Sequence, residues 1–224
     1  MAYFLHIYET ALREECGYGG ALVYWDWTLD AYHLAESVVF DPKTGFGGDG
    51  EKDGSITIGR TGRCVTDGPF MDVIADFYDI KAQPHCLSRG FRKDDGTLGQ
   101  IDGKLVTPES IEETLQLNTY EAFVAEMESK VHDAIPFGIG GDFETFTAPY
   151  DPLFFLHHTQ LDRLWWLWQQ RDPEKRFNEY GGHKQRHSMD MAQLSDEVRM
   201  QGIAVPVTVG EVMDTENHLL RYRY

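Results

Sequence analysis

Cysteine is scarce in this sequence. Only three are present, at positions 16, 64 and 86, and no two of them form a CxxC pair. An odd count at this spacing argues against a zinc knuckle and against a dense disulfide framework. Cys64 and Cys86 can pair with each other, which would leave Cys16 alone.

Basic side chains are also few. The 20 Lys and Arg residues stand against 37 Asp and Glu residues, which gives a net charge of −17. Such a charge repels phosphate backbones and anionic lipid surfaces, so neither nucleic acid nor a membrane is expected as a partner. No apolar run approaches the roughly 18 residues of a membrane span, and the first residues lack the features of a signal peptide. We therefore expect a soluble chain, whose location the sequence leaves unknown.

The sequence is rich in apolar and aromatic residues. Hydrophobic residues make up 42% of the 224 positions, enough for one compact domain over residues 1–224. Aromatic residues reach 13%, which suits either an ordinary core or a site for an aromatic ligand. We interpret Trp25 and Trp27 as part of the core.

Helical periodicity appears in three places. Leu5, Tyr8 and Leu12 recur at helical spacing within residues 3–16, and Gly17 follows as a stop signal. A second helix is predicted to begin with a capping box at Asn118 and to end at His132. A third is predicted to open at His157 and His158 and to continue through Trp168.

The segments around these helices are less regular. Residues 41–110 are rich in Gly, Asp, Thr and Pro and predict a long irregular stretch with one short strand pair. The tail predicts two strands, at residues 204–209 and 219–224.

Histidine positions suggest chemistry. His132 closes one predicted helix, and His157 and His158 open the next, so two antiparallel helices can direct His132 and one of the pair to a common point. Asp162 lies one turn after His158, where a carboxylate can accept the second ring N–H of a metal ligand. A metal site and a hydrogen-bonded histidine pair without metal both remain open on these residues alone.

Three runs of sequence resemble a known family. They are HDAIPFGIGGDF (132–143), APYDPLFFLHH (148–158) and LDRLWWLWQ (161–169), supported by ALREECGYGGALVYWDW (11–27), CVTDGPF (64–70), HCLSRGF (85–91) and Tyr222–Tyr224. Together they resemble the second copper motif of fungal tyrosinases and catechol oxidases. The resemblance implies a mainly α fold: a partial antiparallel helical bundle of the tyrosinase and haemocyanin type, with long irregular segments and a few short strands.

The resemblance also implies an activity. Such proteins hold two copper ions, each bound by three histidines, and use dioxygen to oxidise phenols or catechols to quinones. By resemblance, His132 and His158 are the first and third ligands of the second copper, and His157 and Asp162 support them. Asp133 takes the place of a residue that holds a water, and this water accepts the proton of the phenol.

One position departs from the family pattern. The second ligand would lie four residues after His132, where this sequence has Pro136, which has no metal-binding side chain and which we expect to end the helix. Two imidazoles then remain for this copper, unless Asp142, His183, His187 or a water completes the set.

A second departure from the family pattern lies in the first five residues of the sequence. Family members reach the YWDW segment after a motif similar to His-Arg-Tyr-Phe-Leu, where this sequence reads Met1-Ala-Tyr-Phe-Leu. We therefore expect the first copper site to be absent and at most one copper ion to bind. Oxidation by this chain alone should be impaired. Apolar faces left exposed should favour self-association. The alternative is a non-redox enzyme with one zinc or copper ion, or a metal-free binding protein on the same fold.

Overall fold

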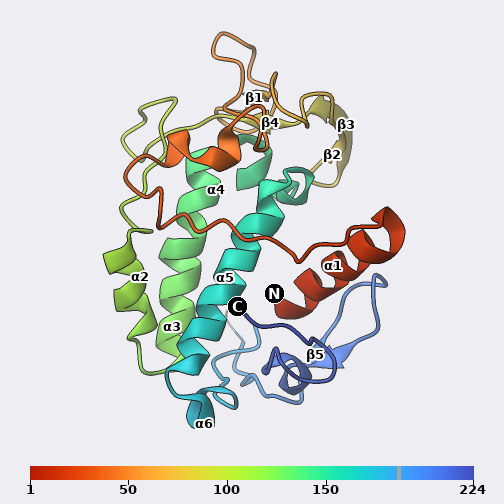
Figure 1. Ribbon diagram of the computed structural model, residues 1–224, viewed down its shortest axis with the longest axis vertical. Coiled ribbons are helices and arrows are strands. Elements are labelled where there is room, and N and C mark those ends of the chain that lie inside the picture. The colour runs from red at the N-terminus through yellow and green to blue at the C-terminus, as the bar shows by residue number, and fades with distance from the viewer. Residues whose placement is uncertain (186–187) are drawn as a thin grey trace. The chain divides into compact units, whose positions relative to one another are not determined.

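Helices dominate the computed structural model, which describes residues 1–185 and 188–224 (Figure 1). The α-helices are α1 (Ala2–Cys16), α2 (Pro108–Leu115), α3 (Tyr120–Glu126), α4 (Asp133–Ile139), α5 (Leu153–Gln170) and α6 (Pro173–Arg176). The strands are β1 (Arg63–Cys64), β2 (Ile74–Tyr78), β3 (Lys81–Cys86), β4 (Ser88–Arg89), β5 (Glu197–Val198) and β6 (Val207–Thr208). The predicted mainly α fold with a few short strands is confirmed.

The chain divides into two compact units, each described here by itself. The first comprises Met1–Tyr24, Glu113–Met127 and His158–Tyr224, and the second comprises Trp25–Glu112 and Glu128–His157. Among the described residues, no helix has the length and apolar character needed to cross a membrane.

In the first unit, α1 packs against the C-terminal part of the chain. Ala2 and Tyr3 share a buried cluster with Val207 and Leu220, and Figure 1 shows α1 beside this segment. The helix ends as predicted, because Gly17 takes the left-handed conformation at φ 68° and donates its N–H to the carbonyl of Leu12.

Aromatic packing joins α3 to the later part of α5 in the first unit. The rings of Phe123 and Trp168 are stacked with centroids 4.8 Å apart, and the indole N–H of Trp168 donates to the carbonyl oxygen of Leu117 at 2.7 Å. The cap of α3 is Thr119, whose hydroxyl accepts the N–H of Ala122, so the predicted cap at Asn118 was wrong by one residue.

The tail differs from its prediction. β6 pairs with β5 in antiparallel register, which confirms a short strand within residues 204–209. No strand forms over residues 219–224, all of which the structure describes, so the second predicted strand was wrong. The tyrosines of that segment bind a side chain of α5 instead.

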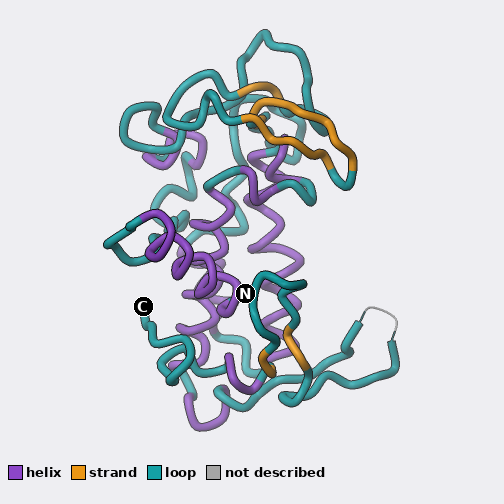
Figure 2. The backbone as a smooth tube through the Cα atoms, turned by 90° about the vertical axis from the view of Figure 1, so that its right-hand side faces the viewer, coloured by secondary structure: helices purple, strands orange, loops and turns teal. Residues whose placement is uncertain are grey.

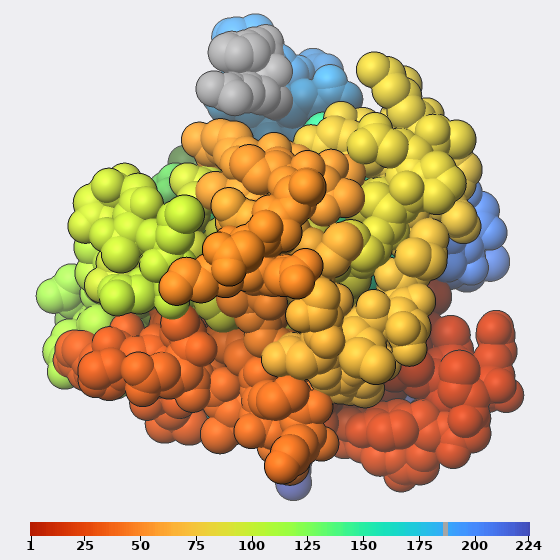
Figure 3. Space-filling model, turned by 90° about the horizontal axis from the view of Figure 1, so that it is seen from above, coloured from red at the N-terminus to blue at the C-terminus, as the bar shows by residue number. Residues whose placement is uncertain are grey.

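The second unit contains most of the irregular middle. Two strand pairs occur there rather than the one predicted: β1 pairs with β4, and β2 pairs with β3 in a hairpin (Figure 2). Figure 3 shows the atoms of this segment in orange and yellow. Cys64 and Cys86 form a disulfide, as the sequence allowed, and Cys16 in the other unit is a free, exposed thiol.

The helical run around His132 is longer than predicted. A π turn spans Met127–His132, and α4 continues from Asp133 to Ile139 with Pro136 inside it. Pro136 has no N–H to donate to the carbonyl four residues earlier, which belongs to His132. Because hydrogen bonds in a π turn span five residues rather than four, the register changes at His132 and the proline is accommodated. The prediction that Pro136 ends the helix was wrong.

Helix α5 begins earlier than the histidine pair. Asp151 accepts the N–H of Leu153 at 3.0 Å and so satisfies one free donor of the first turn. The guanidinium of the fully buried Arg89 donates to both carboxylate oxygens of Asp151, at 2.7 and 2.9 Å. His157 and His158 therefore lie in the second turn of a helix whose start is fixed by a buried ion pair.

Candidate functional site

Two of the predicted site histidines lie side by side in the second unit. The rings of His132 and His157 have centroids 5.5 Å apart and are tilted by 38°. His157 is fully buried, while the side chain of His132 is 28% exposed. The π turn places His132, and the second turn of α5 places His157.

The hydrogen bond of His132 defines its tautomer. Its Nδ1 lies 3.0 Å from Oδ1 of Asp133. An ionised carboxylate only accepts hydrogen bonds, so Nδ1 carries the hydrogen and the ring lone pair is on Nε2. This is the tautomer that a metal ligand uses, with a carboxylate behind the ring that fixes its orientation.

His157 has the opposite arrangement. The indole N–H of Trp27 donates to Nδ1 of His157 at 3.2 Å, and Trp27 is fully buried. Indole nitrogen is only a donor, so the lone pair of Nδ1 accepts this bond and the ring hydrogen of neutral His157 is on Nε2. In this tautomer His157 has no lone pair to offer a metal. The supporting role predicted for His157 stays a prediction.

His158 and Asp162 belong to the first unit, and both are buried. Oδ2 of Asp162 accepts hydrogen bonds from the hydroxyls of Tyr222, at 2.5 Å, and Tyr224, at 2.9 Å. Burial raises the pKa of Asp162 above its ordinary value, and the two phenol hydrogen bonds oppose that shift. Burial and the charge of Asp162 raise the pKa of both tyrosines, so both hydroxyls stay protonated.

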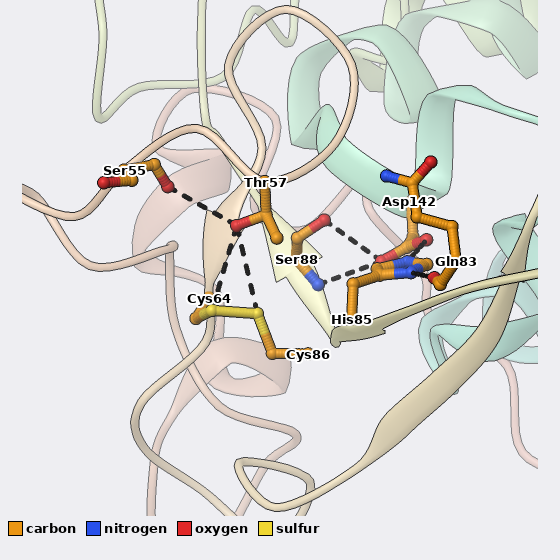
Figure 4. The surroundings of a disulfide bond; sticks show 8 residues. All are labelled: Ser55, Thr57, Cys64, Gln83, His85, Cys86, Ser88 and Asp142. Atoms are coloured by element: carbon orange, nitrogen blue, oxygen red, sulfur yellow. Dashed lines mark hydrogen bonds and ion pairs between the residues drawn. A yellow bond between two sulfur atoms is a disulfide. The ribbon is translucent and has the colours of Figure 1, made fainter.

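Asp142 does not replace the ligand missing at Pro136. Its carboxylate is fully buried and accepts four hydrogen bonds. Three come from His85 Nε2 at 2.8 Å and from the N–H and hydroxyl of Ser88 at 3.0 Å (Figure 4), and the fourth comes from the Thr147 hydroxyl at 3.0 Å. A carboxylate has about four lone-pair sites, so its accepting capacity is used.

His85 extends this network toward the disulfide. Its Nδ1 lies 2.7 Å from the carbonyl oxygen of Gln83, while Nε2 faces Asp142. Both neighbours accept, and a ring satisfies both at once only as an imidazolium. Figure 4 shows this pair beside the disulfide of Cys64 and Cys86. These contacts give His85 a structural role.

The other candidate that the structure describes does not complete a metal site. His183 is exposed and faces Met191 across a hairpin, and His187 lies outside the described residues. No group of three or more His, Cys, Asp or Glu side chains suited to a metal ion occurs among the residues that the structure describes. The residues that the structure describes therefore do not fit the three-histidine copper site of the family.

The family itself is decided by comparison with known proteins. A family model described as the common central domain of tyrosinase matches residues 3–171. The chain belongs to this family. It is 45% identical over 237 residues to the tyrosinase-like protein phomQ1 of Diaporthe leptostromiformis. This alignment covers 99% of this chain and 61% of phomQ1.

Two further similarities support the assignment. The chain is 45% identical over 222 residues to tyrosinase ustQ of Aspergillus flavus, which covers 99% of this chain and 62% of that protein. The chain is also similar to a solved structure of polyphenol oxidase (mutant G292N) from Thermothelomyces thermophila, with a TM-score of 0.79 and 28% identity. The match covers 100% of this chain and 71% of the polyphenol oxidase chain. The chain thus has the tyrosinase-type fold, and it spans less than two thirds of each of the two curated relatives.

Two contributors to the site were missed in the sequence. Trp27 was assigned to the core, which is correct, but its N–H also sets the tautomer of His157. Tyr222 and Tyr224 were noted only for their resemblance to the family, and both bind Asp162. A tryptophan or tyrosine in a core usually finds a partner for its polar atom, so the residue types were a signal, but the partners lie more than 50 positions away.

Proposed function

We propose that this chain is the second-copper part of a tyrosinase-like oxidoreductase that acts on phenols or catechols with dioxygen. His132 and His158 are its metal ligands, and His157 and Asp162 hold them in place. At most one copper binds, and this chain alone oxidises phenols weakly or not at all. The observation that carries the proposal is the 45% identity to tyrosinase-family proteins over 99% of this chain.

The local chemistry supports this assignment of roles. His132 has the tautomer of a metal ligand, whereas His157 has its lone pair on Nδ1 engaged by Trp27. Consecutive residues of a helix point about 100° apart, so the side chains of His157 and His158 have different surroundings and different tasks. Metal would supply the redox chemistry, and the chain supplies imidazoles of defined orientation.

Asp133 is the residue proposed to direct proton removal. Its side chain is 44% exposed and remains within reach of solvent, while one oxygen accepts from His132. A carboxylate placed beside a ligand and open to water can hold a water molecule that takes a phenol proton. The substrate class comes from the family.

Pro136 favours a second candidate function. A proline inside α4 leaves a three-histidine site incomplete, and Asp142 does not replace the lost ligand. A site with one weakly held zinc or copper ion, acting without redox chemistry, or a metal-free binding protein on the same fold, would need no third imidazole.

The proposal is tested by restoring the lost ligand. Pro136→His places an imidazole in α4 four residues after His132, at the position of the ligand that the family pattern requires. Copper content by elemental analysis should stay at or below one ion per wild-type chain, and copper affinity should rise by more than about tenfold in Pro136→His. His132→Gln and His158→Gln should each lower affinity.

Ala134→His is the matched control, because its side chain points to a different face of the same helix. It should leave copper affinity near the wild-type value. Two copper ions per wild-type chain together with catechol oxidation would contradict the impaired-chain proposal. Binding that is unchanged in both His132→Gln and His158→Gln would contradict the ligand assignment, and exclusive zinc binding would favour the second candidate.

A further inference from the structure

A short hairpin in the first unit carries an unusual set of side chains. Its two arms meet at an isolated bridge between His183 and Met191. Ala192 donates its N–H to the carbonyl of Gly182, and Lys184 donates to the carbonyl of Asp190, both at 2.9 Å. Figure 2 shows these arms on either side of the grey residues.

This bonding pattern fixes which side chains are close. The two hydrogen bonds flank the bridge, so His183 and Met191 are a non-hydrogen-bonded antiparallel pair, in which Cα atoms are about 4.5 Å apart and side chains are nearest. Met189 lies two residues before Met191 and so shares its face, diagonal to His183 and within reach of a long side chain.

All three side chains are exposed. Met189 is 89% exposed and Met191 is 52% exposed, while His183 is also open to solvent. Methionine is normally among the buried residue types, and two exposed thioethers beside one imidazole serve no core. The exposure leaves the sulfur atoms accessible to a ligand from solvent.

The charged side chains that the structure describes in the two arms of the hairpin, Lys184 and Asp190, lie on its other face. Lys184 and Asp190 alternate with the three residues and so point the opposite way. The ammonium of Lys184 lies 2.5 Å from Oδ1 of Asp196, which holds this positive charge in an ion pair. Among the described residues of the hairpin, the face with His183 and the two methionines therefore carries no cationic side chain that would repel a metal ion.

We propose that His183, Met189 and Met191 form a surface binding site for a soft monovalent metal ion, copper(I). Thioether sulfur selects copper(I) over harder ions, and imidazole is also a good copper ligand. Two thioethers and one imidazole give an ion three ligands without a buried charge. The site uses neither His132 nor His158 and does not depend on the proposed oxidase function.

Such a site could take up copper(I) and pass it on. An exposed set of soft ligands can accept copper(I) from a donor without any local opening of the fold. Ligands on an exposed hairpin also release the ion more readily than a closed, rigid site does. The hairpin is thus suited to uptake and transfer of the ion, rather than to its permanent storage.

The test measures metal binding directly rather than activity. The folded chain, labelled with ¹³C at the methionine methyl groups, is titrated with silver(I) as a redox-inert probe of copper(I) sites. Methyl signals of Met189 and Met191 should shift, and copper(I) affinity should be measured in parallel by competition with a coloured chelator. The double variant Met189→Leu/Met191→Leu should lose affinity by more than about tenfold, and His183→Gln by a smaller factor.

Met71→Leu is the matched control, because Met71 is 49% exposed and lies in the other unit. Its copper(I) affinity should equal that of the wild type, and circular dichroism should confirm that every variant is folded. Unshifted Met189 and Met191 signals, or an unchanged affinity in the double variant, would overturn the proposal. Loss of binding in His132→Gln with no change in the hairpin variants would likewise assign copper(I) to the interior instead.

Discussion

Each unit contains a buried aspartate, and the two carboxylates have different hydrogen-bond partners. Asp142 in the second unit has four hydrogen-bond donors, one of them the ring of His85. Asp162 in the first unit has the hydroxyls of Tyr222 and Tyr224, both on one oxygen. Charge-assisted bonds and backbone N–H groups stabilise an anion more than phenols do. Asp142 is therefore held firmly by its four donors. Asp162 has weaker partners, and burial raises its pKa.

The difference explains why a nearby carboxylate did not replace the lost ligand. Asp142 lies only six residues after Pro136, but moving it to a metal would leave His85, Ser88 and Thr147 without their acceptor. Each buried donor left without a partner costs about 1–3 kcal/mol. A ligand change at this site is therefore opposed by the packing around it.

The largest effect expected is at Asp142. Asp142→Asn replaces the carboxylate with a neutral amide of the same shape and leaves the imidazolium of His85 buried without a counter-charge. The free energy of unfolding should fall by about 3–5 kcal/mol, as measured by urea denaturation near neutral pH. Asp53→Asn, at an exposed position, should change stability by less than about 0.5 kcal/mol. A loss below about 1 kcal/mol in Asp142→Asn would refute the charged pair.

A smaller effect is expected in the first unit. Tyr222→Phe removes one of the two phenol donors from Asp162 and keeps the ring packing. The free energy of unfolding should fall by about 1–3 kcal/mol, because the carboxylate keeps its burial but loses a hydrogen bond. Tyr18→Phe removes a hydroxyl that donates to the Ala21 carbonyl at the surface, and its effect should be smaller. If Tyr222→Phe and Tyr18→Phe lowered the free energy of unfolding equally, the hydrogen bond from Tyr222 to the buried Asp162 would not contribute more than a surface hydrogen bond.

The third effect, which is absent at neutral pH, is a pH dependence confined to alkaline conditions. The folded-state pKa of Tyr222 and Tyr224 is raised above the ordinary value of 10.0, so only the unfolded chain loses these protons near that pH. Their contribution to stability is complete below pH 10.0 and is lost as pH rises beyond it, by up to about 1.4 kcal/mol per pH unit for each tyrosine. Urea midpoints from about pH 9 to about pH 11 should fall less steeply in Tyr222→Phe/Tyr224→Phe. Parallel curves for variant and wild type would contradict this linkage.

Local patterns predicted the parts of the fold that depend on local physics. The spacing of apolar residues and the glycine stop located α1, and the Trp168 run located most of α5. The family resemblance identified the tyrosinase-type fold, which the comparisons confirm. The metal ligands His132 and His158 remain predictions.

The failures have a common physical origin. A π turn before Pro136 changes the hydrogen-bond register, and nothing in a 3.6-residue periodicity signals that change. Residues 219–224 alternate like a strand, but their tyrosines are directed to a carboxylate 60 and 62 positions away. In both cases an interaction distant in the sequence or a shifted backbone register overrode the local pattern.

The disulfide beside His85 also acts on the unfolded chain. It joins residues separated by 22 positions, so it forbids many extended conformations that the reduced, unfolded chain would sample. Loop-closure entropy of this size is worth about 3 kcal/mol. A chain made under reducing conditions would keep every contact of Asp142 and still unfold more readily, because its denatured ensemble would be larger.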